Sequence, residues 1–558
     1  MKKSFKINFN IIAIIAIIIF CVSITPITFQ NDTYYTIKIG ELISNNGIDM
    51  KDHFSWHENL DYTYPHWLYD LGTYHIYNIG QNIGLSGGIN NGGMYAIYIV
   101  TLLLTIVLGL TIYLTNRKLS KNNLISFLLT LGAIYVIRDF IAARAQLVTF
   151  ILFMLEIYFI EMFIDTKKKR YPIFLVLISV LIANLHVAVW PFFFILFMPY
   201  IVEYIIVLIK EAYLIDKLII KSKEIKLNRL KNKNADEVKI KSLEEIIEKN
   251  KLKFEEIKLE KEEKRNNPYK LVIKKNTAVK WLILVMIICI LTGFITPIGD
   301  MPFTYLIKTM QGNTTENINE HLPLTLIQNK EFLTLIAIYL GLLIFTKVKI
   351  DLKDLFLLGG LILLTFITKR QVSLCAILTT FILNNMICSF LELNAKNYKD
   401  ILKKLEEDIL VQLIILISVV AISINIFEPK VDDDFVDVTQ YPTEASKFIK
   451  ENIDLEGMKL YNEYNYGSYL LYQGIPVFID SRADLYSPEF NEGIDVFSDF
   501  LDISNIGLYY EEKFEEYGIT HIIIYENAKL NLFISRNENY TKLYEDEYFV
   551  IYERNIKE

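Results

Sequence analysis

Several features that are common in soluble enzymes are scarce or absent in this sequence. Its four cysteines all lie inside apolar runs without Cys-x-x-Cys spacing, so neither a disulfide framework nor a thiolate metal site is indicated. No glycine-rich phosphate-binding loop is present, which leaves the use of nucleotide sugars unsupported. Basic residues are not in excess, because 57 Lys and Arg stand against 64 Asp and Glu for a net charge of -7. That balance gives no reason to expect a nucleic-acid partner.

Apolar residues, in contrast, are abundant. The chain has 558 residues, of which 53% are hydrophobic and 22% are charged, and its mean hydropathy is +0.31. This is too apolar for a soluble protein of several domains, although the charged fraction is ordinary. Charge and apolarity must therefore be segregated along the chain, as they are in a membrane protein.

The apolar residues form runs that predict about eleven membrane-spanning helices, since a crossing takes roughly 20 residues. Two of the runs, 332–346 and 355–368, are short enough to leave the count open by two. The first run follows basic residues and continues without a small-x-small cleavage site, so we expect a retained span and not a signal peptide. The runs cover 11–29, 94–115, 123–137, 145–164, 171–186, 187–209, 278–296, 332–346, 355–368, 371–391 and 409–427.

The distribution of Lys and Arg predicts the orientation in the cytoplasmic membrane. Most basic segments fall on one side if the N-terminus is inside, and the C-terminal portion then lies outside. Four cations break this pattern by falling at the outer boundary: Arg138, Arg144, Lys369 and Arg370. Cations placed against the rule are candidates for binding an anion, and interfacial snorkelling is an equally weighted alternative.

The same pattern predicts a mainly α protein of two parts. Residues 1–427 form a polytopic transmembrane helical bundle with a long outer loop, 30–93, and a Lys- and Glu-rich helical insertion, 213–277, in the cytoplasm. Residues 428–558 form an extracytoplasmic α/β domain. Within it we expect helices at 443–452, 506–517 and 527–535, and strands at 458–461, 477–480, 521–525 and 549–552.

Acidic and imidazole groups concentrate in the outer loop 30–93, which holds four of the seven histidines. Such groups move protons or bind divalent cations, although most can equally serve to satisfy a folded loop. His53 and His57 have i, i+4 spacing but no third ligand, so a histidine metal site is weakly indicated. Asp32 stands out because it follows the first span directly, where a carboxylate would face a substrate at the membrane boundary.

Short motifs in this loop carry a resemblance to a known family. The run 31–40 (NDTYYTIKIG), with 52–55 (DHFS) and 65–68 (PHWL), resembles the first outer loop of multi-pass, lipid-carrier-dependent glycosyltransferases of the GT-C type. The resemblance implies that Asp32 is the catalytic or metal-binding carboxylate and that Asp52, His66 and Trp67 bind substrate. It also implies a bundle with many spans, a long first outer loop and a soluble outer domain.

Further motifs agree in part with that family. The segments 462–470 (NEYNYGSYL) and 476–486 (PVFIDSRADLY) resemble a bacterial branch of GT-C-like proteins, and Glu320 begins a stretch (EHLP) similar to an outer Glu-Trp-x-Pro element. Two positions depart from the pattern. Tyr34 stands where an Asp-x-Asp pair would have its second carboxylate, and His66 replaces the Glu of a Glu-Trp-Leu pattern. The divalent cation, Mg²⁺ or Mn²⁺, that the family suggests is thereby put in doubt.

Arg482 is a further candidate, because it follows an apolar run and is flanked by Asp480 and Asp484. One interpretation is that Arg482 binds a sugar or phosphate between the carboxylates. The alternative is an Arg-carboxylate network that fixes the loop.

These observations predict an integral membrane glycosyltransferase that moves a sugar from a polyprenyl-phosphate carrier to an extracytoplasmic glycan or protein acceptor. Asp32 would be the base or the metal anchor, and Arg138, Arg144 and Arg370 would bind the carrier phosphate. A non-catalytic GT-C-like scaffold in cell-surface polysaccharide assembly is the main alternative. A transporter is less favoured, because most spans lack a central charge and no internal repeat is evident.

Overall fold

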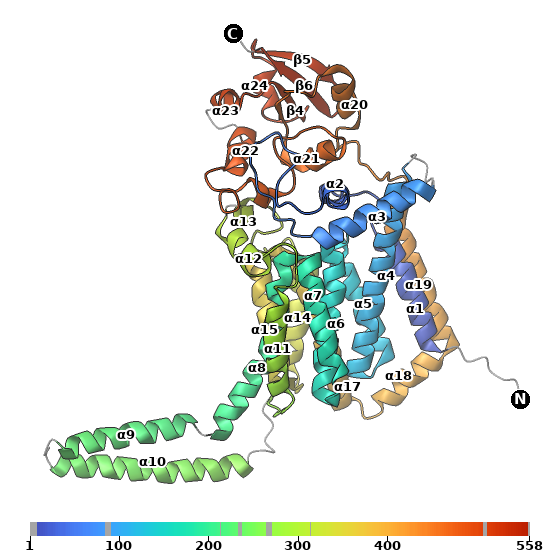
Figure 1. Cartoon of the computed structure of the whole chain (residues 1–558). Coiled ribbons are helices and arrows are strands. Elements are labelled where there is room, and N and C mark those ends of the chain that lie inside the picture. The colour runs from blue at the N-terminus through green and yellow to red at the C-terminus, as the bar shows by residue number, and fades with distance from the viewer. Residues whose placement is uncertain are drawn as a thin grey trace, which may run out of the picture.

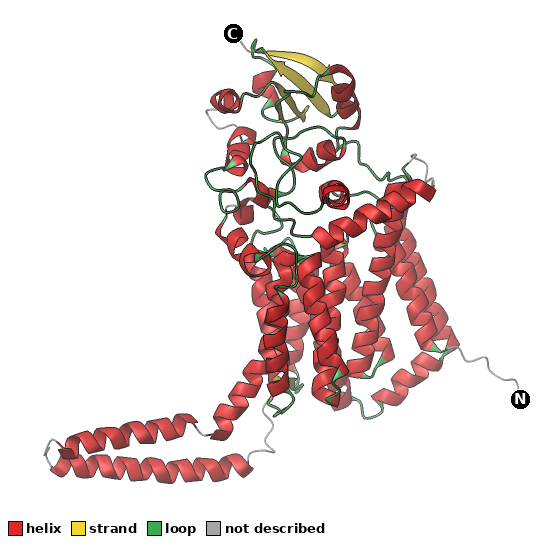
Figure 2. Ribbon diagram, viewed as in Figure 1, coloured by secondary structure: helices red, strands yellow, loops and turns green. Residues whose placement is uncertain are grey.

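The computed structural model has a helical bundle with a mixed α/β domain at one end and a helical hairpin at the other (Figure 1). It describes residues 8–83, 91–212, 214–232, 237–263, 270–312, 314–505 and 510–555. Figure 2 shows that helices dominate and that the longer strands are confined to the C-terminal domain. The mainly α bundle with a C-terminal α/β domain is therefore as predicted.

Every predicted apolar run contains a helix of the bundle. Among the described residues, four helical segments are long and apolar enough to cross a membrane, and a pair of helices bent by 49° gives a fifth if the pair forms one span. The total of eleven spans stays a prediction. The bundle helices are α1 (Phe9–Ile24), α4 (Gly92–Ser120), α5 (Asn123–Val136), α6 (Ala145–Thr166), α7 (Arg170–Leu185), α8 (Trp190–Ala212), α11 (Val279–Thr292), α14 (Lys330–Phe345), α15 (Leu352–Ile367), α16 (Val372–Leu378), α17 (Thr380–Asn394) and α19 (Ile409–Phe427).

Local chemistry sets several helix ends. The Asn91 and Asn122 side chains accept hydrogen bonds from the backbone amides of Met94 and Ile125, which caps α4 and α5. Lys121 and Lys167 end α4 and α6 in the left-handed conformation. Inside the bundle, small residues bring α1 and α4 close, because a Cβ added at Gly109 would lie 2.9 Å from the Cys21 sulfur.

The predicted outer loop 30–93 contains two helices, α2 (Asn31–Asn46) and α3 (Trp67–Ile83), between the bundle and the C-terminal domain (Figure 1). They cross closely at Gly40, where an added Cβ would lie 2.1 Å from the Asp70 carbonyl oxygen. Only glycine fits there without moving the backbone. A buried core shared by α2, the segment after it and the C-terminal domain holds this layer together.

The C-terminal domain has a four-stranded sheet in the order β3-β4-β6-β5. β3 pairs parallel with β4, and the other neighbours pair antiparallel. Its elements are α20 (Thr443–Asn452), β3 (Leu460–Tyr461), α21 (Tyr464–Tyr472), α22 (Val496–Ser504), α23 (Tyr510–Tyr517), β4 (His521–Tyr525), α24 (Asn531–Ile534), β5 (Tyr540–Glu545) and β6 (Phe549–Arg554).

The structure corrects three details of this domain. Residues 477–480 are not a strand but an extended buried segment with a single bridge from Val477 to Ser55. The helix expected at 527–535 shortens to α24, and β5 was not expected. The start of the helix predicted at 506–517 lies outside the described residues.

The charged insertion, for which the sequence predicts a cytoplasmic location, contains the two helices α9 (Leu214–Asn232) and α10 (Glu237–Glu263), which run side by side away from the bundle (Figure 1). Ion pairs such as Lys251 to Glu224, at 2.7 Å, link the two helices. The remaining elements are β1 (Leu271–Val272), α12 (Met301–Gln311), α13 (Thr314–Asn317), β2 (Ile350–Asp351) and α18 (Tyr398–Glu407).

Candidate active site

Asp32 lies in the first turn of α2, where the chain leaves α1 and reaches the C-terminal domain. The positive end of a helix dipole favours a carboxylate at this position. Its side chain is only 17% exposed. Burial alone would raise the pKa of Asp32, but Arg144 and a hydrogen bond from Ser481 outweigh burial and hold it below its usual value. Asp32 is therefore ionised at neutral pH.

Arg144 is the direct partner of Asp32. Its Nε donates to Asp32 Oδ2 at 2.7 Å, its Nη2 contacts the same oxygen, and its Nη1 donates to Glu320 Oε1 at 3.2 Å. The backbone of Arg144 is extended and precedes α6. The Thr33 hydroxyl donates to the neighbouring Ala143 carbonyl at 3.4 Å, which ties this segment to α2. One guanidinium thus joins two carboxylates from distant parts of the chain.

Glu320 is positioned by the segment that carries Arg370. The Glu320 carbonyl accepts a hydrogen bond from the Arg370 amide at 3.0 Å and from the Thr368 hydroxyl at 3.1 Å. Burial would raise the pKa of the Glu320 carboxyl, yet Arg144 and Arg370 together hold it below its usual value. Both carboxylates of the cluster are therefore charged.

The Arg370 side chain differs from that of Arg144. It feels the charges of Glu320, Arg144 and Asp32, but no ion pair within 4.0 Å joins it to any residue that the structure describes. Arg138 is paired instead with Glu331, at 3.2 Å, and lies over the Tyr135 ring. Of the three arginines predicted to bind phosphate, Arg370 is the one whose charge remains available.

Histidines line the same region. The His66 and His186 rings lie 4.8 Å apart, and His186 Nδ1 is 3.0 Å from the Thr149 hydroxyl. Burial lowers the pKa of His66 to about 4, with Arg370 and Arg144 acting in the same direction against Asp32. Burial likewise lowers the pKa of His321 to about 4. These imidazoles are neutral at pH 7, so they can donate or accept a hydrogen bond without adding charge.

Trp67 fixes the start of α3 to the bundle. Its indole nitrogen donates to the Asn184 side-chain oxygen at 3.1 Å, and the Asn184 amide donates to the Ile295 carbonyl at 2.9 Å. The structure thus connects Trp67 to the helix that ends beside His186. Trp67 positions the His66 backbone next to the cluster.

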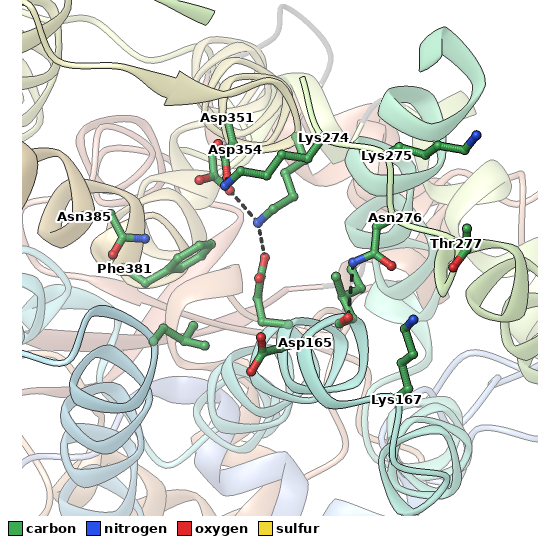
Figure 3. Close-up of a pocket in the computed structure, with 14 residues that line it drawn as sticks. Asp165, Lys167, Lys274, Lys275, Asn276, Thr277, Asp351, Asp354, Phe381 and Asn385 are labelled. Atoms are coloured by element: carbon green, nitrogen blue, oxygen red, sulfur yellow. Dashed lines mark hydrogen bonds and ion pairs between the residues drawn. The ribbon is translucent and has the colours of Figure 1, made fainter. Parts of the chain in front are cut away.

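A hollow of about 500 Å³ lies elsewhere, at the opposite end of α6 (Figure 3). Three of the four carboxylates that line it are paired with lysines, because Lys353 contacts Glu161 and Asp354, and Lys274 lies 2.6 Å from Asp351. α6 starts next to Arg144 and has 22 residues, so the hollow and the Asp32 cluster are roughly 30 Å apart. The hollow is not part of the candidate site.

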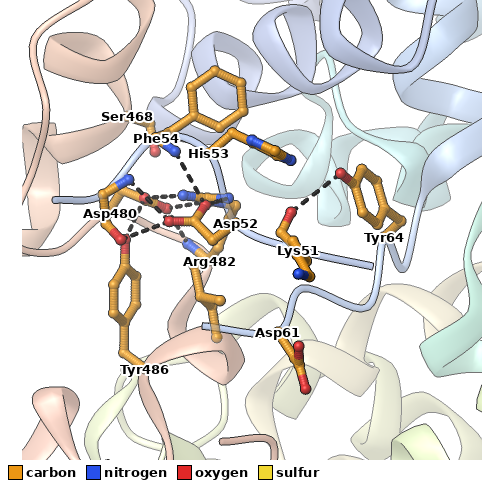
Figure 4. Close-up of polar contacts among 12 residues, drawn as sticks. Lys51, Asp52, His53, Phe54, Asp61, Tyr64, Ser468, Asp480, Arg482 and Tyr486 are labelled. Carbon is orange, nitrogen blue, oxygen red and sulfur yellow. Dashed lines mark hydrogen bonds and ion pairs between the residues drawn. The ribbon is translucent and has the colours of Figure 1, made fainter. Parts of the chain in front are cut away.

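Asp52 and Arg482 meet in a second, fully buried network (Figure 4). Arg482 Nη1 donates to Asp52 at 2.6 Å, while its Nε and Nη2 donate to both oxygens of Asp480 at 2.9 and 2.7 Å. Tyr486 donates to Asp480 and Ser55 donates to Asp52, both at 2.6 Å. The Arg482 side chain is 2% exposed. This geometry is that expected for the loop-fixing alternative, because the guanidinium is buried and its Nε, Nη1 and Nη2 all donate to carboxylates of the protein.

The Asp484 carboxylate binds two hydroxyl groups of α12. It accepts hydrogen bonds from the hydroxyls of Tyr305, at 2.5 Å, and Thr309, at 3.2 Å. This joins α12 to the C-terminal domain, above the segment that leads to Glu320.

Sequence reasoning did not single out Ser481 or Asp70. Ser481 lies inside the 476–486 motif and hydrogen-bonds to Asp32, so the motif itself was the signal. Asp70 is fully buried, and burial raises its pKa well above the usual value against a weaker contribution from Thr36. No sequence pattern distinguished Asp70 from the other acids of the loop.

The side chains do not form an evident metal site. Within the described ranges, no three His, Cys, Asp or Glu side chains are grouped closely enough to hold a metal ion. The two carboxylates that approach each other, Asp32 and Glu320, are bridged by a guanidinium. This donor set does not fit the divalent cation that the family resemblance suggests.

Comparison with known proteins shows similarity in structure alone. No protein-family model matches the chain, and no curated protein matches its sequence. The oligosaccharyltransferase of Archaeoglobus fulgidus in its apo form aligns with a TM-score of 0.54 and 11% identity, over 94% of this chain and 70% of the other. The archaeal oligosaccharyltransferase AglB from the same organism, in complex with an inhibitory peptide and a dolichol-phosphate, aligns with 0.54 and 10% identity, over 92% and 69%. The chain therefore has the GT-C-like membrane fold that the sequence motifs predicted.

Proposed function

We propose that this protein is an integral membrane glycosyltransferase that moves a sugar from a polyprenyl-phosphate carrier to an acceptor on the side of the C-terminal domain. The observation that carries the proposal is that a proton acceptor and a cation lie in one cluster at one end of the bundle. An ionised carboxylate, Asp32, lies in the same cluster as Arg370, a cation without an ion-pair partner among the described residues.

In the proposed reaction, Asp32 accepts the proton of the acceptor hydroxyl or amide as that group attacks the first carbon of the sugar. The bond between that carbon and the phosphate oxygen breaks, and the electron pair leaves with the carrier phosphate. Arg370 stabilises the charge that develops on the departing oxygen. Arg144 holds the Asp32 carboxylate in place and keeps it ionised before the acceptor arrives.

The other predicted residues have supporting roles in this proposal. His66 is a neutral hydrogen-bonding group for the sugar or the phosphate, and Trp67 orients it. Glu320 positions Arg144 and connects it to the segment that carries Arg370. Asp52 and Arg482 join the outer segment to the C-terminal domain, and Arg138 lies at the membrane boundary on the same side.

The structural neighbour supports the proposed donor and acceptor classes. The AglB structure is a complex with an inhibitory peptide and a dolichol-phosphate. By analogy, we propose a lipid-linked donor and a glycan or peptide acceptor for this chain. The predicted orientation would put the reaction outside the cytoplasmic membrane.

One observation favours a non-catalytic scaffold as the second candidate. Two nitrogens of Arg144 already contact one oxygen of Asp32, and such an ion pair can also serve only to fix α2. A scaffold would keep its function when the Asp32 charge is removed.

The test is incorporation of labelled sugar from a panel of polyprenyl-phosphate sugars, with wild type, Asp32→Asn and Asp61→Asn at matched expression. Asp61 is an exposed carboxylate of the same outer segment, so its variant controls for loss of a charge. We expect Asp32→Asn to lower transfer on the order of 10³-fold and Asp61→Asn to leave it unchanged. Transfer that survives in Asp32→Asn would refute the role of Asp32, and a wild type inactive with every donor would favour the scaffold.

A further inference from the structure

The centre of the cluster is already occupied by a cation that belongs to the protein. Three nitrogens of Arg144 contact Asp32 and Glu320, which come from α2 and from the segment after α13. A divalent ion that used both carboxylates would have to displace this guanidinium. We infer that Arg144 is the resident cation of the site and that the Asp32–Glu320 pair takes no divalent metal ion.

The charges of the cluster support this inference. Asp32 and Glu320 carry one negative charge each, and Arg144 and Arg370 carry one positive charge each. The four charges therefore cancel before any ligand binds. A divalent ion would enter a site without net charge, next to two guanidinium groups. No net negative potential would offset the free-energy cost of desolvating the ion.

The guanidinium is also held in place from the backbone. Arg144 immediately precedes α6, and its amide donates to the Ala142 carbonyl at 2.8 Å. The Thr33 hydroxyl donates to the carbonyl of the residue before Arg144. The Arg144 side chain is 25% exposed and the Asp32 side chain 17%. A guanidinium held in this direction is preorganised to bind both carboxylates.

The inference distinguishes this chain from a metal-dependent transferase. Mg²⁺ usually binds through one or two carboxylates together with substrate phosphate. Here both carboxylates contact Arg144, and under the proposed function Arg370 binds the phosphate. The negative charge of the leaving group would then be compensated by side chains alone.

The first experiment measures metal binding without reference to activity. Purified protein in detergent is titrated with Mn²⁺, with and without polyprenyl phosphate, and bound Mn²⁺ is measured by electron paramagnetic resonance. We expect wild type and Asp32→Asn to bind the same background amount. Binding of about one Mn²⁺ that disappears in Asp32→Asn would overturn the inference, whatever the protein catalyses.

The second experiment removes the resident cation. Arg144→Ser leaves the two carboxylates facing each other, and we expect this variant to gain Mn²⁺ binding and a higher melting temperature in Mn²⁺. Arg144→Lys keeps a positive charge and should gain neither. If Arg144→Ser folds and still does not bind Mn²⁺, Arg144 is not the group that excludes the metal. If it does not fold, the wild-type titration still decides.

A third arm tests the consequence for the reaction and rests on the proposed function. Transfer by wild type should be unchanged after treatment with a chelator. Activity that is lost with the chelator and restored by Mg²⁺ or Mn²⁺ would overturn the inference while it supported the proposed transferase. Absence of transfer under all conditions would count against the proposed function and leave the binding result to stand alone.

Discussion

Two arginine–carboxylate clusters connect the segment 30–93 to other parts of the chain. They differ in burial and in how many of their charges are paired within the protein. In the closed network, the Asp52 and Arg482 side chains are 1% and 2% exposed, and Arg482 donates hydrogen bonds to carboxylates of the protein. In the Asp32–Arg144 cluster the side chains are 17% and 25% exposed, and Arg370 nearby has no ion-pair partner among the described residues. The closed cluster is suited to stability, whereas the open one has capacity for a ligand.

The largest expected effect comes from breaking the closed network. Arg482→Met should leave Asp52 and Asp480 buried without a counter-charge, and we expect a loss of about 3–5 kcal/mol in the free energy of unfolding. Equilibrium denaturation of the purified protein in mixed micelles measures this loss. Arg138→Met is the matched control, because Arg138 and Glu331 are 32% and 41% exposed and such a pair contributes about 0–1 kcal/mol. Equal effects of the two substitutions would contradict the assignment of Arg482 to a structural network.

The open cluster should respond more in activity than in stability. Arg370→Gln removes a charge that no described side chain neutralises by an ion pair. Because Arg370 also lowers the pKa of Glu320, we expect a small loss in the free energy of unfolding, well below that of Arg482→Met. Transfer should fall on the order of 10²-fold, as expected for the loss of one group that stabilises the developing charge. Labelled-sugar incorporation measures the fall.

Lys369→Gln is the control for Arg370→Gln, since Lys369 is the adjacent, exposed cation. It should leave transfer unchanged. If both substitutions lowered transfer equally, the effect would be one of general surface charge and not of a phosphate ligand.

The bundle could be predicted from sequence because bilayer-length apolar runs have few alternatives to a helix. The run at 477–480 was misassigned because a buried extended segment and a buried strand have the same apolar composition. β5 was missed because Thr541 and Lys542 face outward, and its apolar residues are too few to stand out. Tertiary pairing, which local sequence does not contain, decides both cases.

Part of the candidate site was also accessible from sequence. Asp32 was distinguished by its position after the first span, and Arg144 and Arg370 by their exception to the distribution of basic residues. What the sequence could not indicate is that Arg144 joins Asp32, 112 residues away, to Glu320, 176 residues away. The inference of a resident cation depends on that contact, and a contact of this kind follows only from the packing of α2 against the start of α6.

The smallest expected effect is a pH dependence that originates beside the closed network. His57 Nε2 donates to the Phe478 carbonyl at 2.8 Å, and burial lowers the pKa of His57 to about 4. Between that value and the usual pKa of about 6.5, the unfolded chain binds a proton that the folded chain does not. Stability should therefore fall as the pH drops from 7 to 5, by roughly 2 kcal/mol for this residue. His57→Gln should flatten the dependence by that amount, while His75→Gln, at an exposed position on α3, should leave it unchanged. If His57→Gln does not alter the pH dependence, the dependence originates in the histidines around Asp32. The loss of stability in acid would then come from the open cluster and not from the closed network.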